Sequence, residues 1–315
     1  MRVLVTGGAG FIGSNLVAEL LARGHSVKVL DNFSTGHRRN LAEVDSDIEL
    51  IEGDLRSYER VHHAVRGCDV VFHEGALPSV PRSVQDPITT SEINVTGTLN
   101  VLLNARDQGV GRLVFASSSS IYGDAPGLPR TEGITPKPLA PYAVSKLAAE
   151  QYCSVFSTVY GLETVSLRYF NVFGRNQDPG SQYSAVIPRF IFAMREGRAP
   201  TIYGTGEQSR DFTHIDDVVA ANMLAMEQPP AGGEVLNIAC GAAHSLNELV
   251  EILNRRLGTD IAPDHAPPRR GDIERSWADI SRAREVLEYV PSVDFEQGLR
   301  RTIENFAESP IASSA

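Results

Sequence analysis

The first half of the chain alternates short apolar runs with longer stretches in which apolar residues recur every three or four positions. The short runs are rich in Val, Ile, Leu and Phe and lack strict alternation, which is typical of strands buried on both faces of a parallel sheet. We predict strands at residues 2–5, 26–30, 48–52, 70–73, 112–117 and 164–168. We predict helices at residues 11–23, 57–66, 96–108 and 142–159. This alternation predicts an α/β fold with a doubly wound parallel sheet.

The pattern changes after Gly174, where residues 175–183 are polar and loop-like. Further helices are expected at residues 185–196, 213–226, 245–257, 281–288 and 295–308, with a strand at 234–239 and an extended, proline-containing stretch at 261–271. Ser245 should cap its helix, and Glu248 stands where a capping box needs it. We predict two domains, a larger one of residues 1–174 to which 213–241 return, and a smaller α/β domain formed by 175–212 and 242–315.

Composition restricts the classes of partner. The 315 residues carry 29 Lys and Arg against 39 Asp and Glu, a net charge of −10, which disfavours nucleic acid and membrane surfaces as partners. Cys68, Cys153 and Cys240 are widely spaced, so we expect neither a disulfide scaffold nor a metal site, and a reducing cytoplasm fits. Neither a signal peptide nor a transmembrane segment is expected, since no long apolar run occurs.

A glycine-rich loop follows the first predicted strand directly and opens the first helix. Gly7, Gly10 and Gly13 have the spacing with which backbone N–H groups approach a diphosphate and a helix packs closely on a sheet. The alternative is a purely structural glycine-rich turn, which the strand before the loop and the helix after it disfavour. A Walker loop is excluded because Ser14 stands where a lysine is required. The loop therefore predicts a dinucleotide site.

Two acidic residues end the second and third predicted strands. A carboxylate at Asp31 can accept hydrogen bonds from the adenosine ribose and would repel a 2′-phosphate, which favours NAD over NADP. Arg38 and Arg39 lie nearby and would suit NADP. Asp54 is placed to meet the adenine edge, although a turn-forming aspartate explains its position nearly as well.

A tyrosine and a lysine stand four residues apart at the start of a predicted helix. Tyr142 and Lys146 therefore project from one face. An ammonium and a cationic nicotinamide would both lower the pKa of the phenol, ordinarily about 10, and make it a general acid and base. The four serines of 117–120 end the preceding strand, where an open α/β sheet binds its ligand. Alone, the pair would be read as an exposed tyrosine and a solvated lysine; this context favours catalysis.

The chain resembles the extended short-chain dehydrogenase/reductase family, in particular its nucleotide-sugar 4-epimerases of the UDP-glucose and UDP-N-acetylglucosamine type. Seven motifs carry the resemblance in order along the chain: TGGAGFIG (6–13), DNFSTG (31–36), SSSSIYG (117–123), the pair Tyr142 and Lys146, LRYFNVFG (167–174), SRDFTHIDD (209–217) and RRGDIERSWAD (269–279). The resemblance implies that Tyr142 is the base, that Lys146 assists it and binds ribose, and that Ser118 is the catalytic serine.

The resemblance implies NAD as the cofactor. Its contacts would come from Gly7, Gly10, Phe11, Ile12, Asp31, Asn32, Ser34, Thr35, Gly36, Asp54, Leu55, Gly75, Ala76, Leu77, Asn94, Tyr142, Lys146 and Tyr169. Family members often carry HxAA after the fourth strand, and His73-Glu74-Gly75-Ala76 departs from that pattern.

The substrate side resembles a UDP-sugar pocket. Its residues would be Ser118, Tyr142, Asn171, Gln177, Ala185, Val186, Tyr203, Arg210, Arg269, Asp272 and Ser276. By resemblance, Arg210 and Arg269 clamp the diphosphate, Tyr203 packs on uracil and Asp272 accepts from the uridine ribose. Ser276 matches the position that limits the size of the C2 substituent, so N-acetylhexosamines should be accepted beside UDP-Glc and UDP-Gal.

The competing functions differ in the residues that they need. Nucleotide-sugar dehydratases and decarboxylases resemble one another in an acidic residue beside the catalytic Ser or Thr, whereas this chain has Ser119 and Ser120. UDP-glucuronate 4-epimerase stays an open alternative. A non-catalytic NAD-binding regulator is disfavoured by the intact catalytic residues. By resemblance, a homodimer is expected through the helices at 96–108 and 142–159.

Overall fold

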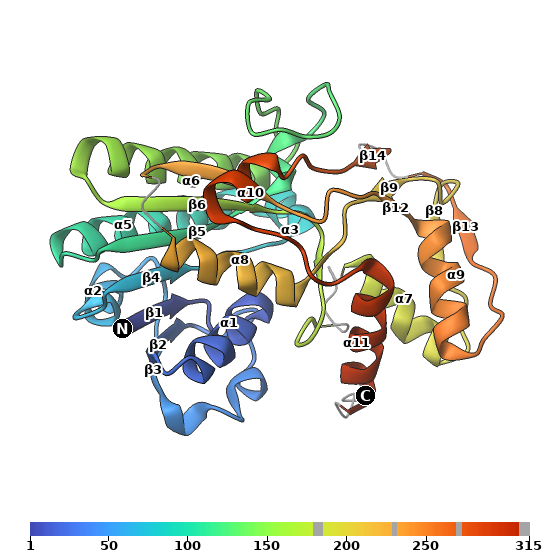
Figure 1. Ribbon diagram of the computed structural model, residues 1–315, viewed down its shortest axis with the longest axis horizontal. Helices are drawn as coiled ribbons and strands as arrows, with labels where there is room; N and C mark the ends of the chain where they lie inside the picture. Colours follow the sequence, from blue (N-terminus) through green and yellow to red (C-terminus); the bar gives the residue numbers. More distant parts are fainter. Residues whose placement is uncertain (179–184, 229–231, 269–272, 309–315) are drawn as a thin grey trace.

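Seven parallel strands form the central sheet of the protein. The computed structural model describes residues 1–178, 185–228, 232–268 and 273–308 (Figure 1). The strands are β1 (Arg2–Thr6), β2 (Ser26–Asp31), β3 (Ile48–Glu52), β4 (Val70–His73), β5 (Arg112–Ser118), β6 (Glu163–Tyr169) and β11 (Glu234–Ile238). Their order is β11-β6-β5-β4-β1-β2-β3, so the direction of winding reverses between β1 and β4. The predicted doubly wound parallel sheet is confirmed, and its ligand crevice is expected at that reversal.

Helices cover both faces of this sheet (Figure 1). One face carries α1 (Phe11–Ala22), α8 (Ile215–Glu227) and α10 (Ser281–Leu287), and the other carries α2 (Tyr58–Val65), α5 (Gly97–Asp107) and α6 (Pro141–Tyr160). Val3 and Val5 pack in the first core and Leu4 in the second. Successive strand residues point to opposite faces, and both faces are covered, which is why the strands are apolar throughout.

The stretch before α5 is more helical than the sequence predicts. Helical turns begin with α3 (Val80–Gln85) and α4 (Pro87–Ser91), followed by a π-helical turn at Glu92–Thr96. The Ser79 hydroxyl accepts from the N–H of Arg82, and Asp86 accepts from the N–H of Thr89. Prolines in these first turns interrupt the apolar period but cost no hydrogen bond, because those N–H groups have no partner within a helix. The predicted helix at 96–108 is confirmed as α5, and the helical turns before it were not predicted.

A smaller part of the chain lies at one end of the sheet (Figure 1). Here α7 (Val186–Arg195), α9 (Leu246–Leu257) and α11 (Phe295–Glu308) enclose a third apolar core. Short strands surround it: β7 (Val172–Phe173) pairs with β10 (Thr213–His214), β8 (Thr201–Tyr203) with β13 (Asp264–Ala266), and β9 (Ser209–Arg210) lies between β12 (His244–Ser245) and β14 (Arg275–Ser276). Strands of two or three residues carry no readable periodicity, and the sequence did not predict them.

The chain returns to the sheet twice. Helix α8 packs on it and β11 pairs with β6. Ala278, Ile280, Ala283, Leu287 and Tyr289 also belong to the core of the sheet, although the predicted division assigned 242–315 wholly to the smaller domain. Their apolar side chains cover the face beside β11 and α8. The two-domain division stays a prediction, from which residues 278–289 depart.

The predicted cap of the helix α9 is present at Ser245. The Ser245 hydroxyl accepts from the N–H of Glu248 at 3.0 Å, as a cap requires. The Glu248 carboxylate lies 2.9 Å from Nδ1 of His244, a contact that the sequence did not predict. Over the ranges that the structure describes, no helix has the length and apolar character needed to cross a membrane.

Candidate active site

The glycine-rich loop joins β1 to α1 and leaves no room for side chains at two positions. Gly7 has φ +68°, and a Cβ atom there would lie 2.7 Å from Cα of Gly75. A Cβ on Gly13 would lie 2.2 Å from the carbonyl oxygen of Gly7. Phe11 and Ile12 begin the helix whose first N–H groups have no partner within it. The loop therefore fits a diphosphate held by backbone donors.

Asp31 ties β2 to this loop. Its buried carboxylate accepts from the N–H of Ala9 at 2.9 Å and of Phe33 at 2.7 Å. Burial raises the pKa of Asp31, and these backbone hydrogen bonds oppose the rise. The predicted segment of Asn32, Ser34, Thr35 and Gly36 folds beside the glycine loop, since a Cβ on Gly36 would lie 2.9 Å from the carbonyl carbon of Ala9. The carboxylate stands at the end of its strand and retains lone pairs for ribose hydroxyls.

Asp54 and Leu55 follow β3. The Asp54 carboxylate accepts from the N–H of Arg56 at 2.8 Å and pairs with its guanidinium at 2.9 Å. These hydrogen bonds lower the pKa of Asp54, and Asn32 donates to the same carboxylate at 3.1 Å. The turn-forming role that the sequence left open is thus present, and the adenine contact stays a prediction. Leu55 is buried.

The segment Gly75, Ala76 and Leu77 after β4 is held by Asn94. The Asn94 amide accepts from the N–H of Leu77 at 2.8 Å and donates to its carbonyl at 3.2 Å and to the hydroxyl of Ser145 at 3.0 Å. Asn94 lies in the π-helical turn and is buried. Its side chain therefore fixes this segment against α6.

The three predicted catalytic side chains come together at the ends of β5 and β6. Ser118 is the register partner of Tyr169, and α6 brings Tyr142 into a hydrogen bond with Ser118. Nζ of Lys146 donates to the carbonyl of Ala116 at 2.7 Å. Burial raises the pKa of Tyr142, opposed by the Ser118 hydrogen bond. Burial lowers the pKa of Lys146 to about 8. Without NAD, the Tyr142 phenol therefore stays protonated near neutrality. It needs added positive charge nearby to ionise and act as a base.

A buried ion pair that the sequence did not predict supports α6. Arg168 donates to the two carboxylate oxygens of Glu150 at 2.9 and 2.7 Å, and the Ser117 hydroxyl donates to the same carboxylate at 2.7 Å. Glu150 is four residues beyond Lys146 and shares its helix face, which is the one sequence signal that could have found it. The pair fixes the face of α6 that carries Tyr142 and Lys146 on β5 and β6.

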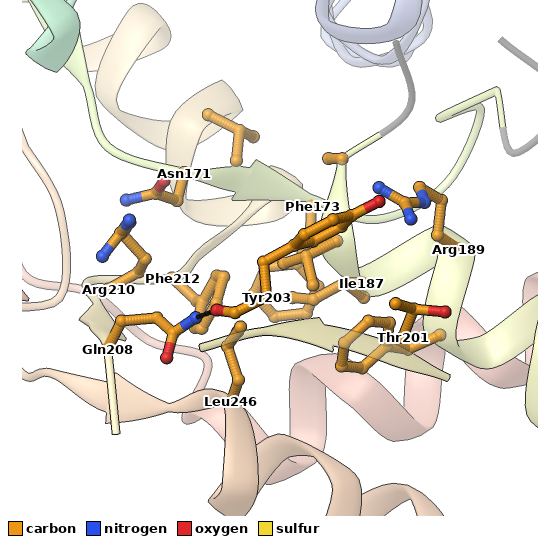
Figure 2. Close-up of a pocket in the computed structure, with 14 residues that line it drawn as sticks. Asn171, Phe173, Ile187, Arg189, Thr201, Tyr203, Gln208, Arg210, Phe212 and Leu246 are labelled. Atoms are coloured by element: carbon orange, nitrogen blue, oxygen red, sulfur yellow. Dashed lines mark hydrogen bonds between the residues drawn. The ribbon is translucent and has the colours of Figure 1, made fainter. Parts of the chain in front are cut away.

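A cavity of about 280 Å³ lies beyond Asn171, two residues after β6 ends (Figure 2). Its predicted residues are Asn171, Ala185, Val186, Tyr203 and Arg210. Figure 2 shows Asn171 and Arg210 on one side, Tyr203 across the middle and Arg189 on the other side. Residues that the sequence did not predict also line it: Val172, Phe173, Ile187, Arg189, Phe190, Thr201, Gln208, Phe212 and Leu246. Arg189 lies four residues beyond Ala185, a predicted substrate residue, and this helical spacing is the sequence feature that could have indicated it.

The other substrate residues that were predicted beyond β6 do not line this cavity or lie outside the described residues. Gln177 donates to the carbonyl of Val172 at 3.1 Å and does not line the cavity. Ser276 is the register partner of Arg210 in β14 and β9. Arg269 and Asp272 lie outside the described residues.

Asp211, beside Arg210, is a further residue that the sequence did not single out. Its buried carboxylate accepts from the N–H groups of Cys240, Gly241 and Ala278 at 2.8 to 3.2 Å. Burial raises the pKa of Asp211 to about 6, against those hydrogen bonds. It holds three segments together behind β9.

Known proteins resemble the chain along nearly its whole length. A UDP-glucose 4-epimerase of Mycolicibacterium smegmatis is 39% identical over 97% of this chain and 98% of its own. A UDP-glucuronate 4-epimerase of Thermodesulfobacterium geofontis is 34% identical over 95% of this chain and 94% of its own. The structure of a UDP-N-acetylglucosamine 4-epimerase from Methanobrevibacter ruminantium M1 superposes with a TM-score of 0.93 at 39% identity, covering 97% of this chain and 98% of that one.

The family model named NAD dependent epimerase/dehydratase family matches residues 3–239. This match confirms the resemblance drawn from the seven motifs. It spans the glycine loop, the Tyr142 and Lys146 pair and the first strands of the smaller part. The chain belongs to the NAD dependent epimerase/dehydratase family, and NAD is its cofactor.

Proposed function

We propose that the chain interconverts UDP-hexoses by inverting the configuration at C4, acting on UDP-Glc and UDP-Gal and also on UDP-GlcNAc and UDP-GalNAc. One observation carries the proposal: Tyr142 is hydrogen-bonded to Ser118, with Lys146 on the same helix face, at the sheet edge that also bears the glycine loop. Such a group can move a hydroxyl proton beside a dinucleotide.

The residues of the chain divide the chemistry between them. NAD, which the glycine loop and Asp31 would hold, would supply a reversible hydride acceptor for C4. Tyr142 removes the O4 proton, and Ser118 hydrogen-bonds the same oxygen. Lys146 stabilises the phenolate by its charge. The 4-keto sugar, still tethered by UDP, turns its other face, and Tyr142 returns the proton. Tight binding of the unreacting UDP retains this intermediate while the hexose turns.

The predicted contacts assign each ligand to one region. The glycine loop would hold the NAD diphosphate, Asp31 its adenosine ribose, and Tyr142 and Lys146 its nicotinamide end. On the substrate side, Arg210 would hold the UDP diphosphate and Tyr203 would pack on uracil. Figure 2 shows the ring of Tyr203 across the middle of the cavity, with Arg210 on one side and Arg189 on the other.

Activity without any added reductant is the direct test. The purified chain, supplied with NAD, should convert UDP-Gal to UDP-Glc, followed by NMR of the anomeric protons. NAD should also appear in the supernatant after acid denaturation of protein purified without it. UDP-GlcNAc and UDP-GlcA complete the panel. Turnover of UDP-GlcA alone would replace the proposal by UDP-glucuronate 4-epimerase, and loss of water or CO₂ would indicate a dehydratase or decarboxylase. No turnover of any of them would favour the NAD-binding regulator.

We also propose that the chain forms a homodimer through α6. Val144, Val155 and Val159 are 47 to 64% exposed on one helix face, and Val84 and Ile88 of the neighbouring α3 and α4 are 63 and 71% exposed. An exposed apolar patch of this kind marks a protein–protein interface, and we assign it to a second copy of the chain.

Val155→Glu should convert the dimer to a monomer, because the interface would bury an unpaired carboxylate twice. Light scattering coupled to gel filtration measures the mass. Val290→Glu is the matched control, since Val290 is 67% exposed away from α6 and should leave the mass unchanged. A parent chain that elutes as a monomer at micromolar concentration would contradict the dimer.

A further inference from the structure

Glu74 has no part in the mechanism above, yet it lies beside the catalytic residues. It follows β4 directly, in the segment that departs from the HxAA pattern. Its Oε1 accepts from the Tyr169 hydroxyl at 2.9 Å, and that hydroxyl accepts from the Asn222 amide at 2.8 Å. Tyr169 is the register partner of Ser118. The half-buried Glu74 carboxyl is therefore anchored at the sheet edge where Tyr142 and Lys146 also lie.

Lys146 reaches the end of β4 from which Glu74 follows: its Nζ lies 4.9 Å from the centroid of the Phe115 ring, and Phe115 is the register partner of His73. Burial raises the pKa of Glu74 to about 7, against the Tyr169 hydrogen bond and the charge of Lys146. Burial lowers the pKa of Lys146 to about 8, and the charge of Glu74 is the largest influence opposing that fall. The carboxylate thus counteracts the desolvation that would leave the amine neutral.

The other ionisable groups around this pair carry little charge near neutrality. His73 is bracketed by the hydroxyls of Thr6 and Thr98 at 2.7 and 2.9 Å, and burial lowers its pKa to about 3. Burial raises the pKa of the Cys153 thiol to about 12. Tyr142 and Tyr169 have pKa values raised by burial.

The remaining carboxylate of this region already has a cation of its own. Glu150 is paired with Arg168 at 2.7 Å. In the described part of the site, Glu74 is therefore the anion available to Lys146. The carbonyl of Ala116 accepts from Lys146 at 2.7 Å and also favours the ammonium, but it carries no net charge.

We propose that Glu74 is a positioning residue of the reaction: anchored by the Tyr169 hydroxyl, its carboxylate keeps Lys146 cationic, so that Lys146 can stabilise the Tyr142 phenolate. The inference rests on the proposed function, because it gives Lys146 that task. It explains why an acid is tolerated in a half-buried position at the cofactor edge, where an uncompensated carboxylate is costly.

Glu74→Gln keeps the shape and the hydrogen bond to Tyr169 and removes the charge. The alkaline limb of the pH profile of kcat should move to lower pH by about one unit, as expected when a nearby opposite charge is removed. Glu163→Gln is the matched control: it changes the same residue type at the other end of β6, where Glu163 pairs with Arg112 at 2.9 Å. Its alkaline limb should coincide with that of the parent.

Thermal unfolding without substrate gives a second readout that needs no turnover. The folded-state pKa of Glu74 lies above its ordinary value of 4.5, so the folded parent binds the extra proton and loses stability as the pH rises from about 4.5 to 7. The glutamine variant lacks this loss. The Tm of the variant relative to the parent should therefore rise between pH 5 and pH 8, whereas a purely structural defect would lower Tm equally at both.

Glu74→Asp keeps the charge and should restore the alkaline limb toward the parent position, even if it folds less stably. An alkaline limb of Glu74→Gln within 0.2 unit of the parent, or a Tm difference that is flat in pH, would overturn the inference. Failure of the proposed function would show instead as a parent chain without turnover, while the Tm comparison would still report on Glu74.

Discussion

Tyr142→Phe should slow UDP-hexose interconversion by about 10³-fold while leaving the binding of NAD and UDP intact. General acid and base catalysis contributes about 10²- to 10⁴-fold, and this phenol is the group hydrogen-bonded to Ser118 at the sheet edge. The substitution removes one hydroxyl from a side chain that packs by its ring, so the fold should tolerate it. Single-turnover reduction of NAD by UDP-Glc, followed at 340 nm, measures the affected step directly.

The control for this substitution lies on the same helix. Tyr160→Phe removes a hydroxyl from a ring that is half exposed at the far end of α6 and packs on Phe156. It should retain the parent rate. Interconversion by Tyr142→Phe at more than a tenth of the parent rate would contradict the assignment, provided that NAD titration shows the variant to be loaded.

The sheet was predictable because each strand satisfies a local rule. Val3, Leu4 and Val5 must be apolar together, since consecutive side chains enter two different cores. The glycine loop then fixes which strand comes first in the winding, because only a strand followed by Gly7 and Gly13 permits the observed backbone approach. Short strands such as β9 and β14 form by pairing with residues 66 positions apart in the chain. A strand of two residues has no local pattern from which it could be predicted.

The proximity of the proposed catalytic residues was predictable for the same reason, whereas the contacts that support them were not. Tyr142 and Lys146 share one helix, so their spacing alone places them together. The ion pair of Glu150 with Arg168 and the hydrogen bond of Glu74 with Tyr169 join different elements. A sequence shows the charge of each residue but not which residues of different elements come into contact. In the sequence, Glu74 is only a departure from the HxAA pattern. Its role could not be predicted without its hydrogen bond to Tyr169.

The orientation of Ser276 can be derived from the faces of the small sheet. Ser209, Arg275 and Trp277 line a groove on one face. Neighbouring residues of a strand point to opposite faces, so Ser276 and its register partner Arg210 face the other side. Arg210 lines the cavity proposed for the nucleotide sugar. The small side chain of Ser276 thus shares the face of Arg210, although it does not itself line the cavity, and its role as the size limit for the sugar stays a prediction.

Ser276→Tyr should lower kcat/KM for UDP-GlcNAc by at least about 10²-fold relative to UDP-Glc, because the added ring would occupy the space of the N-acetyl group. Both sugars are assayed with one enzyme preparation, so a general loss of stability cancels from the ratio. Arg275→Tyr places the same ring on the opposite face of β14 and should leave the ratio unchanged. A ratio unaffected by Ser276→Tyr would show that another residue sets the size limit, and equal loss for both sugars would place Ser276 against the hexose ring itself.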